Sequence, residues 1–161
     1  MRRPSFIPAR VAAIARCLTI GCLAFAGCGE SGPPLHKVEG TVSLDGKPLK
    51  DAEITFIPDP ANAHVTAGSA FSADDGTYKA RFQSSFGLAA GKYVVTVRKT
   101  EVADMSKVPE AMKNDPAQLE MMGLTKPVTK DNYSSPEKSP FKIEVASGGG
   151  PFNFELDSKG R

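Results

Sequence analysis

Among the side chains that could do chemistry, the thiol of Cys28 has the most specific surroundings. The small residues Ala26 and Gly27 come directly before it, at the end of an apolar run from Cys17 to Ala26. Small residues fit the active site of a signal peptidase, and the cysteine thiol is the group that a diacylglycerol would modify. We therefore expect cleavage between Gly27 and Cys28, followed by lipidation of Cys28.

Residues 1–27 have the layout of a signal peptide, because four arginines and no acidic residue accompany the apolar run. About ten apolar residues are too few to cross roughly 30 Å of hydrocarbon, which takes about twenty. No later stretch is longer, so no transmembrane helix is expected. Cys17 and Cys22 leave with the signal. Cys28 is then the single cysteine of an exported chain, which rules out an internal disulfide.

The segment Leu23–Cys28 resembles the lipobox of bacterial lipoproteins, with Phe25 at a position that is usually aliphatic. A second possible lipobox ends at Cys22. It matches the lipobox pattern less well, because the polar Thr19 lies three residues before the cysteine. The resemblance implies a domain held on the extracytoplasmic side of a cell-envelope membrane, in the periplasm or on the surface. The choice between inner and outer membrane stays open.

Removing the signal also changes the charge of the chain. It takes four of the 20 basic residues and none of the 18 acidic ones, which leaves 16 basic residues and a net charge of −2. No basic patch remains that would favour nucleic acid as a partner. The remaining 134 residues suffice for one domain with a single core.

The histidines and the aspartate clusters do not form a recognisable metal site. His36 and His64 lack the spacing that places two ligands on one helix face. Asp45-Gly46 and Asp74-Asp75-Gly76 supply too few oxygens for calcium, and tight turns explain both. We therefore expect exposed loop histidines, no metal and no cofactor.

The mature chain begins with a lipidated cysteine and a flexible tether over residues 28–35, which are rich in Gly and Pro. Residues 36–158 are expected to form one β-sandwich domain, in which several segments alternate apolar and polar residues as half-buried strands do. Turns at Asp45–Pro48 and Asp74–Thr77 favour two hairpins. Seven strands are expected, at residues 38–44, 52–57, 67–73, 78–83, 92–98, 141–145 and 152–156.

Seven turn-punctuated strands without intervening helices predict an all-β fold, a seven-stranded antiparallel β-sandwich. Its core would contain the phenylalanines that alternate inward. These are Phe56, Phe71, Phe82, Phe141, Phe152 and Phe154.

Residues 101–138 interrupt the alternation with four prolines and favour a long excursion with at most a short helix near 110–122. Long loops on a rigid scaffold are where binding sites tend to lie. Its four methionines offer an adaptable apolar contact or, alternatively, cover the sandwich edge. They are Met105, Met112, Met121 and Met122.

Residues 36–157 resemble the small lipoproteins of planctomycete-type bacteria that carry a transthyretin-like, or carboxypeptidase regulatory-like, domain. The similarity lies in segments that include Val38–Val42, Asp45–Leu49, Ala52–Pro58, Asp75–Tyr78, Gly91–Val97, Tyr133, Ser139–Phe141 and Phe152–Leu156. It implies a prealbumin-like, Greek-key sandwich and a non-catalytic extracytoplasmic module. It does not imply a ligand.

The expected function is therefore a membrane-anchored, non-enzymatic module for envelope structure or for binding a protein, glycan or peptide. The serines lie in no strand-turn-helix elbow and have no organised histidine base. The alternative is an envelope hydrolase of the hydroxyisourate hydrolase kind, although the ending Asp157–Arg161 differs from the Tyr-Arg-Gly-Ser of those enzymes. An isopeptide bond between Lys37 and Asn153 is a further, weaker hypothesis, because Asn153 should point to solvent.

Overall fold

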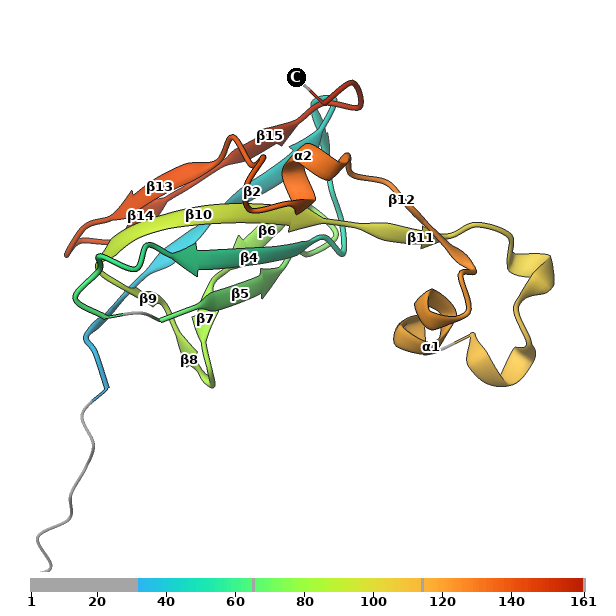
Figure 1. Cartoon of the computed structure of the whole chain (residues 1–161), viewed down its shortest axis with the longest axis horizontal. Coiled ribbons are helices and arrows are strands. Elements are labelled where there is room, and N and C mark those ends of the chain that lie inside the picture. Colours follow the sequence, from blue (N-terminus) through green and yellow to red (C-terminus); the bar gives the residue numbers. More distant parts are fainter. Residues whose placement is uncertain (1–31, 65, 114, 161) are drawn as a thin grey trace, which may run out of the picture. The chain divides into compact units, whose positions relative to one another are not determined.

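The chain folds mainly into strands, which confirms the all-β class (Figure 1). The structure, a computed structural model, describes residues 32–64, 66–113 and 115–160. In chain order the elements are β1 (Leu35–His36), β2 (Val38–Leu44), β3 (Lys47–Pro48), β4 (Glu53–Pro58), β5 (Gly68–Phe71), β6 (Thr77–Lys79), β7 (Arg81–Phe82), β8 (Ser85–Phe86), β9 (Leu88–Ala89), β10 (Gly91–Arg98), β11 (Thr100–Val102), the 3₁₀ turns η1 (Met105–Lys107) and η2 (Glu110–Met112), α1 (Pro116–Met121), β12 (Thr125–Pro127), α2 (Asp131–Ser134), β13 (Lys142–Val145), β14 (Gly150–Pro151) and β15 (Phe154–Leu156).

The first sheet has the order β13-β10-β4-β5-β7-β8, and its strand pairs are antiparallel. β10 is its longest strand and pairs with β4 from Tyr93 opposite Pro58 to Arg98 opposite Glu53. The alternate residues Tyr93, Val95 and Val97 of β10 are buried. β-branched side chains pack well in such a central position.

The second sheet is built around β2. β3 and β6 pair antiparallel with one edge of β2, whereas β14 and β15 pair in parallel with it. The prediction of a purely antiparallel sandwich is therefore wrong for these strands. After β13 the chain leaves the first sheet and joins the second in the direction of β2, a choice that alternation within a strand does not encode.

The turn between β2 and β3 follows the sequence prediction. Leu44 pairs with Lys47, so Asp45 and Gly46 form a two-residue loop. Their φ angles are 50° and 76°. Both values lie in the left-handed region that Asp-Gly accepts in a tight hairpin.

The predicted second hairpin, residues 67–73 with 78–83, instead divides between the two sheets. β5 pairs with β7 only through Ser69 and Arg81, while β6 pairs with β2. Ala80 lies between β6 and β7, and its backbone N–H donates to the carbonyl of Val38 in the second sheet. The chain therefore changes sheets at Ala80, and β5 and β6 separate.

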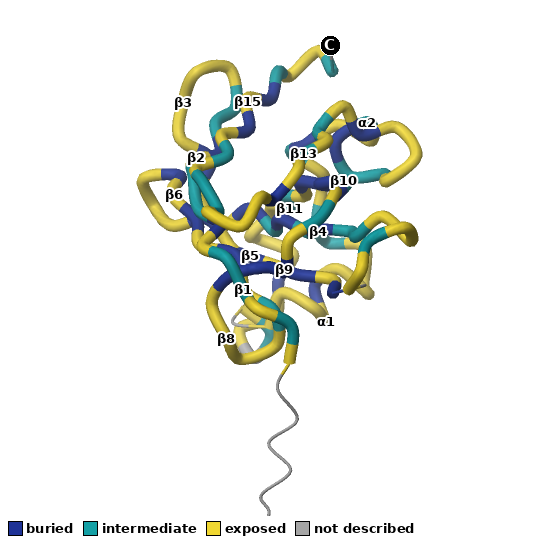
Figure 2. The backbone as a smooth tube through the Cα atoms, turned by 90° about the vertical axis from the view of Figure 1, so that its left-hand side faces the viewer, coloured by how far each residue is buried: buried dark blue, intermediate teal, exposed yellow. Residues whose placement is uncertain are grey.

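The core lies between the two sheets, where the buried segments of facing strands meet (Figure 2). Phe56 of the first sheet lies 6.0 Å from Tyr78 and 6.4 Å from Phe154 of the second sheet, between ring centroids. Five of the six phenylalanines predicted to point inward are buried or packed against this core. The prediction fails for Phe71, which is 69% exposed.

Phe71 points outward because the other face of β5 has no room for a large side chain. The buried residues of β5 are Gly68 and Ala70. A Cβ on Gly68 would overlap the side chain of Leu88, which packs against the glycine. The small residues therefore face the core, and the alternation sends Phe71 to the surface.

The N-terminal end of the domain is more ordered than the predicted tether 28–35. Leu35 pairs with Ala89, and His36 pairs with Leu88, as the ladder of β1 and β9. Leu35 therefore belongs to the domain, because the β9 backbone offers it hydrogen-bond partners. Within the described residues no helix is long and apolar enough to cross a membrane.

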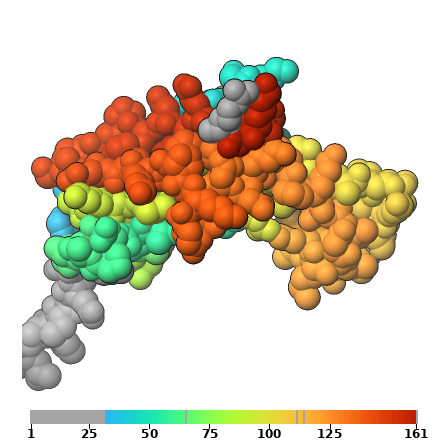
Figure 3. All heavy atoms as spheres, turned by 45° about the horizontal axis from the view of Figure 1, so that its top comes forward, coloured from blue at the N-terminus to red at the C-terminus, as the bar shows by residue number. Residues whose placement is uncertain are grey.

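The excursion after β10 contains an arm, residues 100–127, where the sequence predicted only a loop with a short helix. β11 and β12 form a two-stranded ribbon in which Thr100 is opposite Pro127, and the 3₁₀ turns and α1 lie between them. The short helix near 110–122 is confirmed. Figure 3 shows the residues of the arm gathered beyond one end of the sheets. After the arm, α2 packs against β10.

Candidate functional site

One edge of the first sheet gathers aromatic and basic side chains on its outer face. Phe71 and Ser69 share the outward face of β5, because residues two apart on a strand point the same way. Ser69 pairs with Arg81 of β7, and Arg81 pairs with Phe86 of β8. Paired residues lie on the same face of a sheet. Three strands thus bring these four side chains together.

The two phenyl rings of this edge are open to water. Phe71 is 69% exposed and Phe86 is 65% exposed. Single exposed apolar residues are ordinary, whereas two large ones that line the same groove are candidates for contact with a partner. The sequence pattern identified neither residue as part of a site. Phe71 fitted the alternation of a core residue, and Phe86 stood next to no recognisable strand.

An open groove of about 630 Å³ lies between these side chains, where β5 and β6 separate into different sheets. We call it the β5–β8 groove. Its exposed lining residues are Ser69, Phe71, Ala73, Thr77, Lys79, Arg81, Gln83 and Phe86.

Arg81 is held within the groove by the β7–β8 hairpin. Its guanidinium carbon lies 4.8 Å from the centre of the Phe86 ring, and its Nη2 donates to the carbonyl of Ser84 at 3.3 Å. A cation over an aromatic face contributes about 0.5–1 kcal/mol at an exposed site. The contact fixes the position of the charge and still leaves several N–H donors for a ligand.

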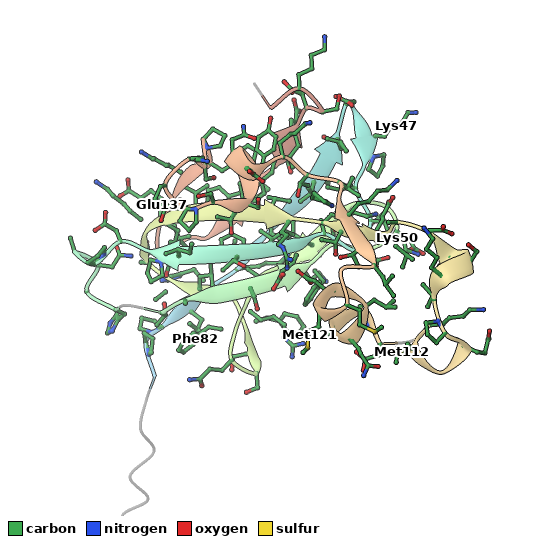
Figure 4. All side chains as sticks on the ribbon, turned by 45° about the vertical axis from the view of Figure 1, so that its right-hand side comes forward. Lys47, Lys50, Phe82, Met112, Met121 and Glu137 are labelled. Atoms are coloured by element: carbon green, nitrogen blue, oxygen red, sulfur yellow. The ribbon has the colours of Figure 1, made fainter. Side chains whose placement is uncertain are left out.

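The β7–β8 hairpin is held in place by its turn geometry and by a side chain that packs against the core. Gln83 has a φ of 54°, which allows a tight turn between β7 and β8. Phe82, labelled in Figure 4, is half-buried and packs against the core, on the face opposite Arg81. The inward ring anchors the hairpin, so the outward residues of the same hairpin are presented on a supported surface.

The charged side chains that line the groove, Lys79 and Arg81, are both basic, and Glu39, which lies opposite Lys79 on β2, pairs with Lys37. None of the described residues that line it carries a carboxylate, and neither Lys79 nor Arg81 forms an ion pair with a described acidic residue. The carboxylate of Asp74 pairs with Lys50 at 2.8 Å. Asp75 accepts hydrogen bonds from the Thr77 hydroxyl and N–H, which lower the pKa of the Asp75 carboxyl.

The aspartate turns are placed as their local chemistry predicts. Asp75 accepts from Thr77 within its own turn, and the Oδ1 of Asp45 accepts from the Ser158 N–H at 3.0 Å. In the part of the chain that the structure describes, no three His, Cys, Asp or Glu side chains lie where they could hold a metal ion.

His36 and His64 are not among the residues that line the groove. His36 is half-buried in β1, which corrects its prediction as an exposed loop residue, and His64 is exposed in the loop between β4 and β5. Neither imidazole hydrogen-bonds to another described residue. The predicted cleavage and lipidation residues, Gly27 and Cys28, lie outside the described residues.

The side chains considered for an isopeptide bond have other partners. Lys37 Nζ lies 2.6 Å from Glu39 at the surface. Asn153 is exposed, as predicted, but its Oδ1 accepts hydrogen bonds from both the backbone N–H and the hydroxyl of Thr41. Between β14 and β15, the side chain of Asn153 thus accepts the β2 backbone hydrogen bond that a strand carbonyl would otherwise accept.

The arm carries a second exposed apolar surface. Met105, Met121 and Met122 are 58%, 89% and 52% exposed, so they do not cover the sandwich edge. Figure 4 labels Met112 and Met121 on this segment. Among the described residues of the arm, Val108 and Leu119 are apolar and buried. An ion pair between Arg98 and Glu120 joins α1 to the end of β10.

Comparisons with protein-family models, with curated proteins and with solved structures find no match for this chain. The candidate site is therefore defined by its own geometry: two exposed phenyl rings, Phe71 and Phe86, beside the cations of Lys79 and Arg81.

Proposed function

We propose that this protein is a bacterial lipoprotein, anchored to an envelope membrane through Cys28, whose extracytoplasmic domain is a non-enzymatic binding module. Its partner is a component of the envelope. The domain would be a transthyretin-like, Greek-key variant of the β-sandwich, with the β5–β8 groove as its binding surface. The observation that carries the proposal is the exposed pair Phe71 and Phe86 beside Arg81.

The start of the domain supports an anchor close to the membrane. Only six residues, 29–34, separate Cys28 from the paired residue Leu35. The seven residue steps from Cys28 to Leu35 cover at most about 24 Å at about 3.4 Å per residue, so the domain would lie within about 24 Å of the lipid. The β1–β9 end of the sheets would therefore face the membrane.

The arm would then lie on the side away from the membrane. β10 begins at Gly91, two residues after β9, and ends at Arg98, two residues before the arm begins at Thr100. Its eight residues span about 26 Å at about 3.3 Å per residue. The exposed methionines of the arm are thus separated from the lipid by the length of the strand.

Surface properties of the groove favour binding. Protein interfaces are enriched in aromatic residues, phenylalanine included, and in arginine. Phe71, Phe86 and Arg81 provide both on three adjacent strands, and Phe82 holds the hairpin in place. A ligand could bury both rings without any change in the core.

Site-specific photo-crosslinking tests the binding surface. Benzoylphenylalanine would replace Phe71 in the full chain, expressed in its own bacterium, and a control protein would carry it at Lys142. Lys142 is exposed and lies on β13, at the opposite edge of the same sheet. We expect ultraviolet light to produce a discrete adduct from position 71 and not from position 142. Equal adducts, or none from either position, would contradict the proposal.

Metabolic labelling with an alkyne fatty acid tests the anchor. The wild-type protein should be labelled and should sediment with membranes, whereas Cys28→Ala should be neither labelled nor retained. The matched control is Cys22→Ala, which removes the cysteine of the weaker box and should leave labelling unchanged. Equal labelling of wild type and Cys28→Ala would overturn the anchor.

A further inference from the structure

We infer that the β5–β8 groove binds an extended, acidic polypeptide segment, whose apolar side chains cover Phe71 and Phe86 and whose carboxylates meet Lys79 and Arg81. This inference rests on the proposed function, because it names the ligand class of the same binding surface.

The spacing of the groove residues fits an extended chain. Ser69 and Phe71 lie two residues apart on the outward face of β5, and Arg81 pairs with Ser69 on the neighbouring strand. Side chains two residues apart in extended backbone are about 6.6–6.8 Å apart. A bound extended segment repeats its own side chains at the same interval. An extended segment lying along β5 would therefore place an apolar side chain over Phe71 and, two residues away, an acidic side chain near Arg81.

Charge selects an acidic segment. The lining contributes the ammonium of Lys79 and the guanidinium of Arg81, and no described lining residue offers a compensating carboxylate. Gln83, Ser69 and Thr77 add polar groups along the groove. Complementary charge speeds association and excludes partners of like charge. A basic segment would place uncompensated cations beside Lys79 and Arg81.

The aromatic geometry favours a polypeptide over an acidic glycan. A sugar ring packs flat against a free aromatic face, and the guanidinium of Arg81 already covers one face of Phe86. The aromatic surface left for a ligand is the exposed ring of Phe71 and the uncovered part of Phe86, which apolar side chains can cover. Interfaces between proteins are enriched in this combination of aromatic residues and arginine.

Selection from a library of random peptides of about 12 residues tests the inference, because such a segment can span an extended recognition groove. The mature chain with its tether would be immobilised and panned. We expect the enriched peptides to contain Asp or Glu alternating with apolar residues. Affinity for the best peptide should fall about tenfold in Arg81→Glu, about fivefold in Phe71→Ser, and should weaken with salt.

The matched control is Lys142→Glu, which makes the same charge change at the opposite edge of the sheet and should bind the peptide as wild type does. Near-ultraviolet circular dichroism would show that each variant keeps the wild-type fold, which is expected because the altered side chains are exposed. Peptides without acidic enrichment, or with equal affinity for Arg81→Glu and Lys142→Glu, would overturn the inference.

Polygalacturonate, an acidic glycan, is the competing probe. Binding of polygalacturonate that depends on Arg81, without selection of acidic peptides, would replace the inferred polypeptide with a glycan. If position 71 gives adducts but the protein selects no acidic peptides and does not bind polygalacturonate, the proposed binding function stands and the acidic ligand is refuted. Loss of the adducts themselves would instead refute the proposed function.

Discussion

The hydroxyl of Tyr78 donates to the carbonyl oxygen of Phe152 at 2.6 Å, from one edge of β2 to the other. Tyr78 belongs to β6 and lies directly opposite Gly40 of β2. Phe152 lies between β14 and β15, which run along the second edge. The side chain of Tyr78 therefore reaches across Gly40 and ties the parallel C-terminal segment to the sheet.

Replacing Gly40 with alanine should destabilise the domain strongly. A Cβ at this position would overlap the carbonyl oxygen of Phe152, which is backbone and cannot rotate away. The expected loss in the free energy of unfolding is about 2–4 kcal/mol, measured by urea denaturation. Gly148→Ala is the control, because its added methyl group meets no atom within 4 Å and should change stability little. Equal stability of the two variants would contradict this packing.

Tyr78→Phe should lower the free energy of unfolding by about 1–2 kcal/mol. The substitution keeps the ring, which stacks on Phe154 with centroids 5.8 Å apart, and removes only the donor to Phe152. The cost comes from a carbonyl left without its partner. A loss below about 0.3 kcal/mol, within ordinary error, would show that water replaces the hydroxyl.

Burial of Tyr78 should also make the free energy of unfolding depend on pH. Burial raises the pKa of Tyr78 in the folded state. The unfolded value is about 10, so the folded state holds the proton more tightly. The stability from Tyr78 is fully present below pH ~10 and is lost as the pH rises above it, with a limiting slope of about 1.4 kcal/mol per unit. Urea denaturation between about pH 8 and pH 11 should show a shallower fall for Tyr78→Phe than for wild type. Parallel curves would contradict this assignment.

Ser72→Ala should cost about 2 kcal/mol, because the hydroxyl joins two backbone segments inside the domain. Its Oγ donates to the carbonyl of Leu49 at 2.6 Å and accepts from the N–H of Ala52 at 2.8 Å. Ser69→Ala, on the exposed face of β5, is the matched control and should change stability by less than about 0.5 kcal/mol. Thermal or urea unfolding compares the two, and a loss of similar size in both would refute the buried bridge.

Removing the arm should leave the sandwich stable. The chain would be shortened from Val102 to Thr125 by replacing residues 103–124 with an Asn-Gly turn, which suits the existing pair Val102–Thr125. Val108 and Leu119, although buried, are not part of the core cluster between the sheets. The free energy of unfolding should stay within about 1 kcal/mol of wild type. A much larger loss would show that the arm supports the core.

Much of the strand pattern follows from the sequence by itself. The alternation of Val38 and Val42, and of Tyr93, Val95 and Val97, identifies core-facing residues because side chains on a strand alternate between two faces. Asp45-Gly46 predicts its hairpin because both residues accept a positive φ. The signal-like segment and the lipidation of Cys28 are likewise sequence inferences, and they remain predictions.

The tertiary structure decided which strands pair and which face of β5 is buried. Alternation is a local property, so it does not show that β15 runs parallel to β2 or that the chain changes sheets at Ala80. The large apolar side chain of Phe71 likewise does not show which face of β5 points outward. Leu88 is distant in sequence but packs against Gly68, and this contact forces the small residues inward and the phenyl ring outward. The candidate binding surface exists because of that long-range packing.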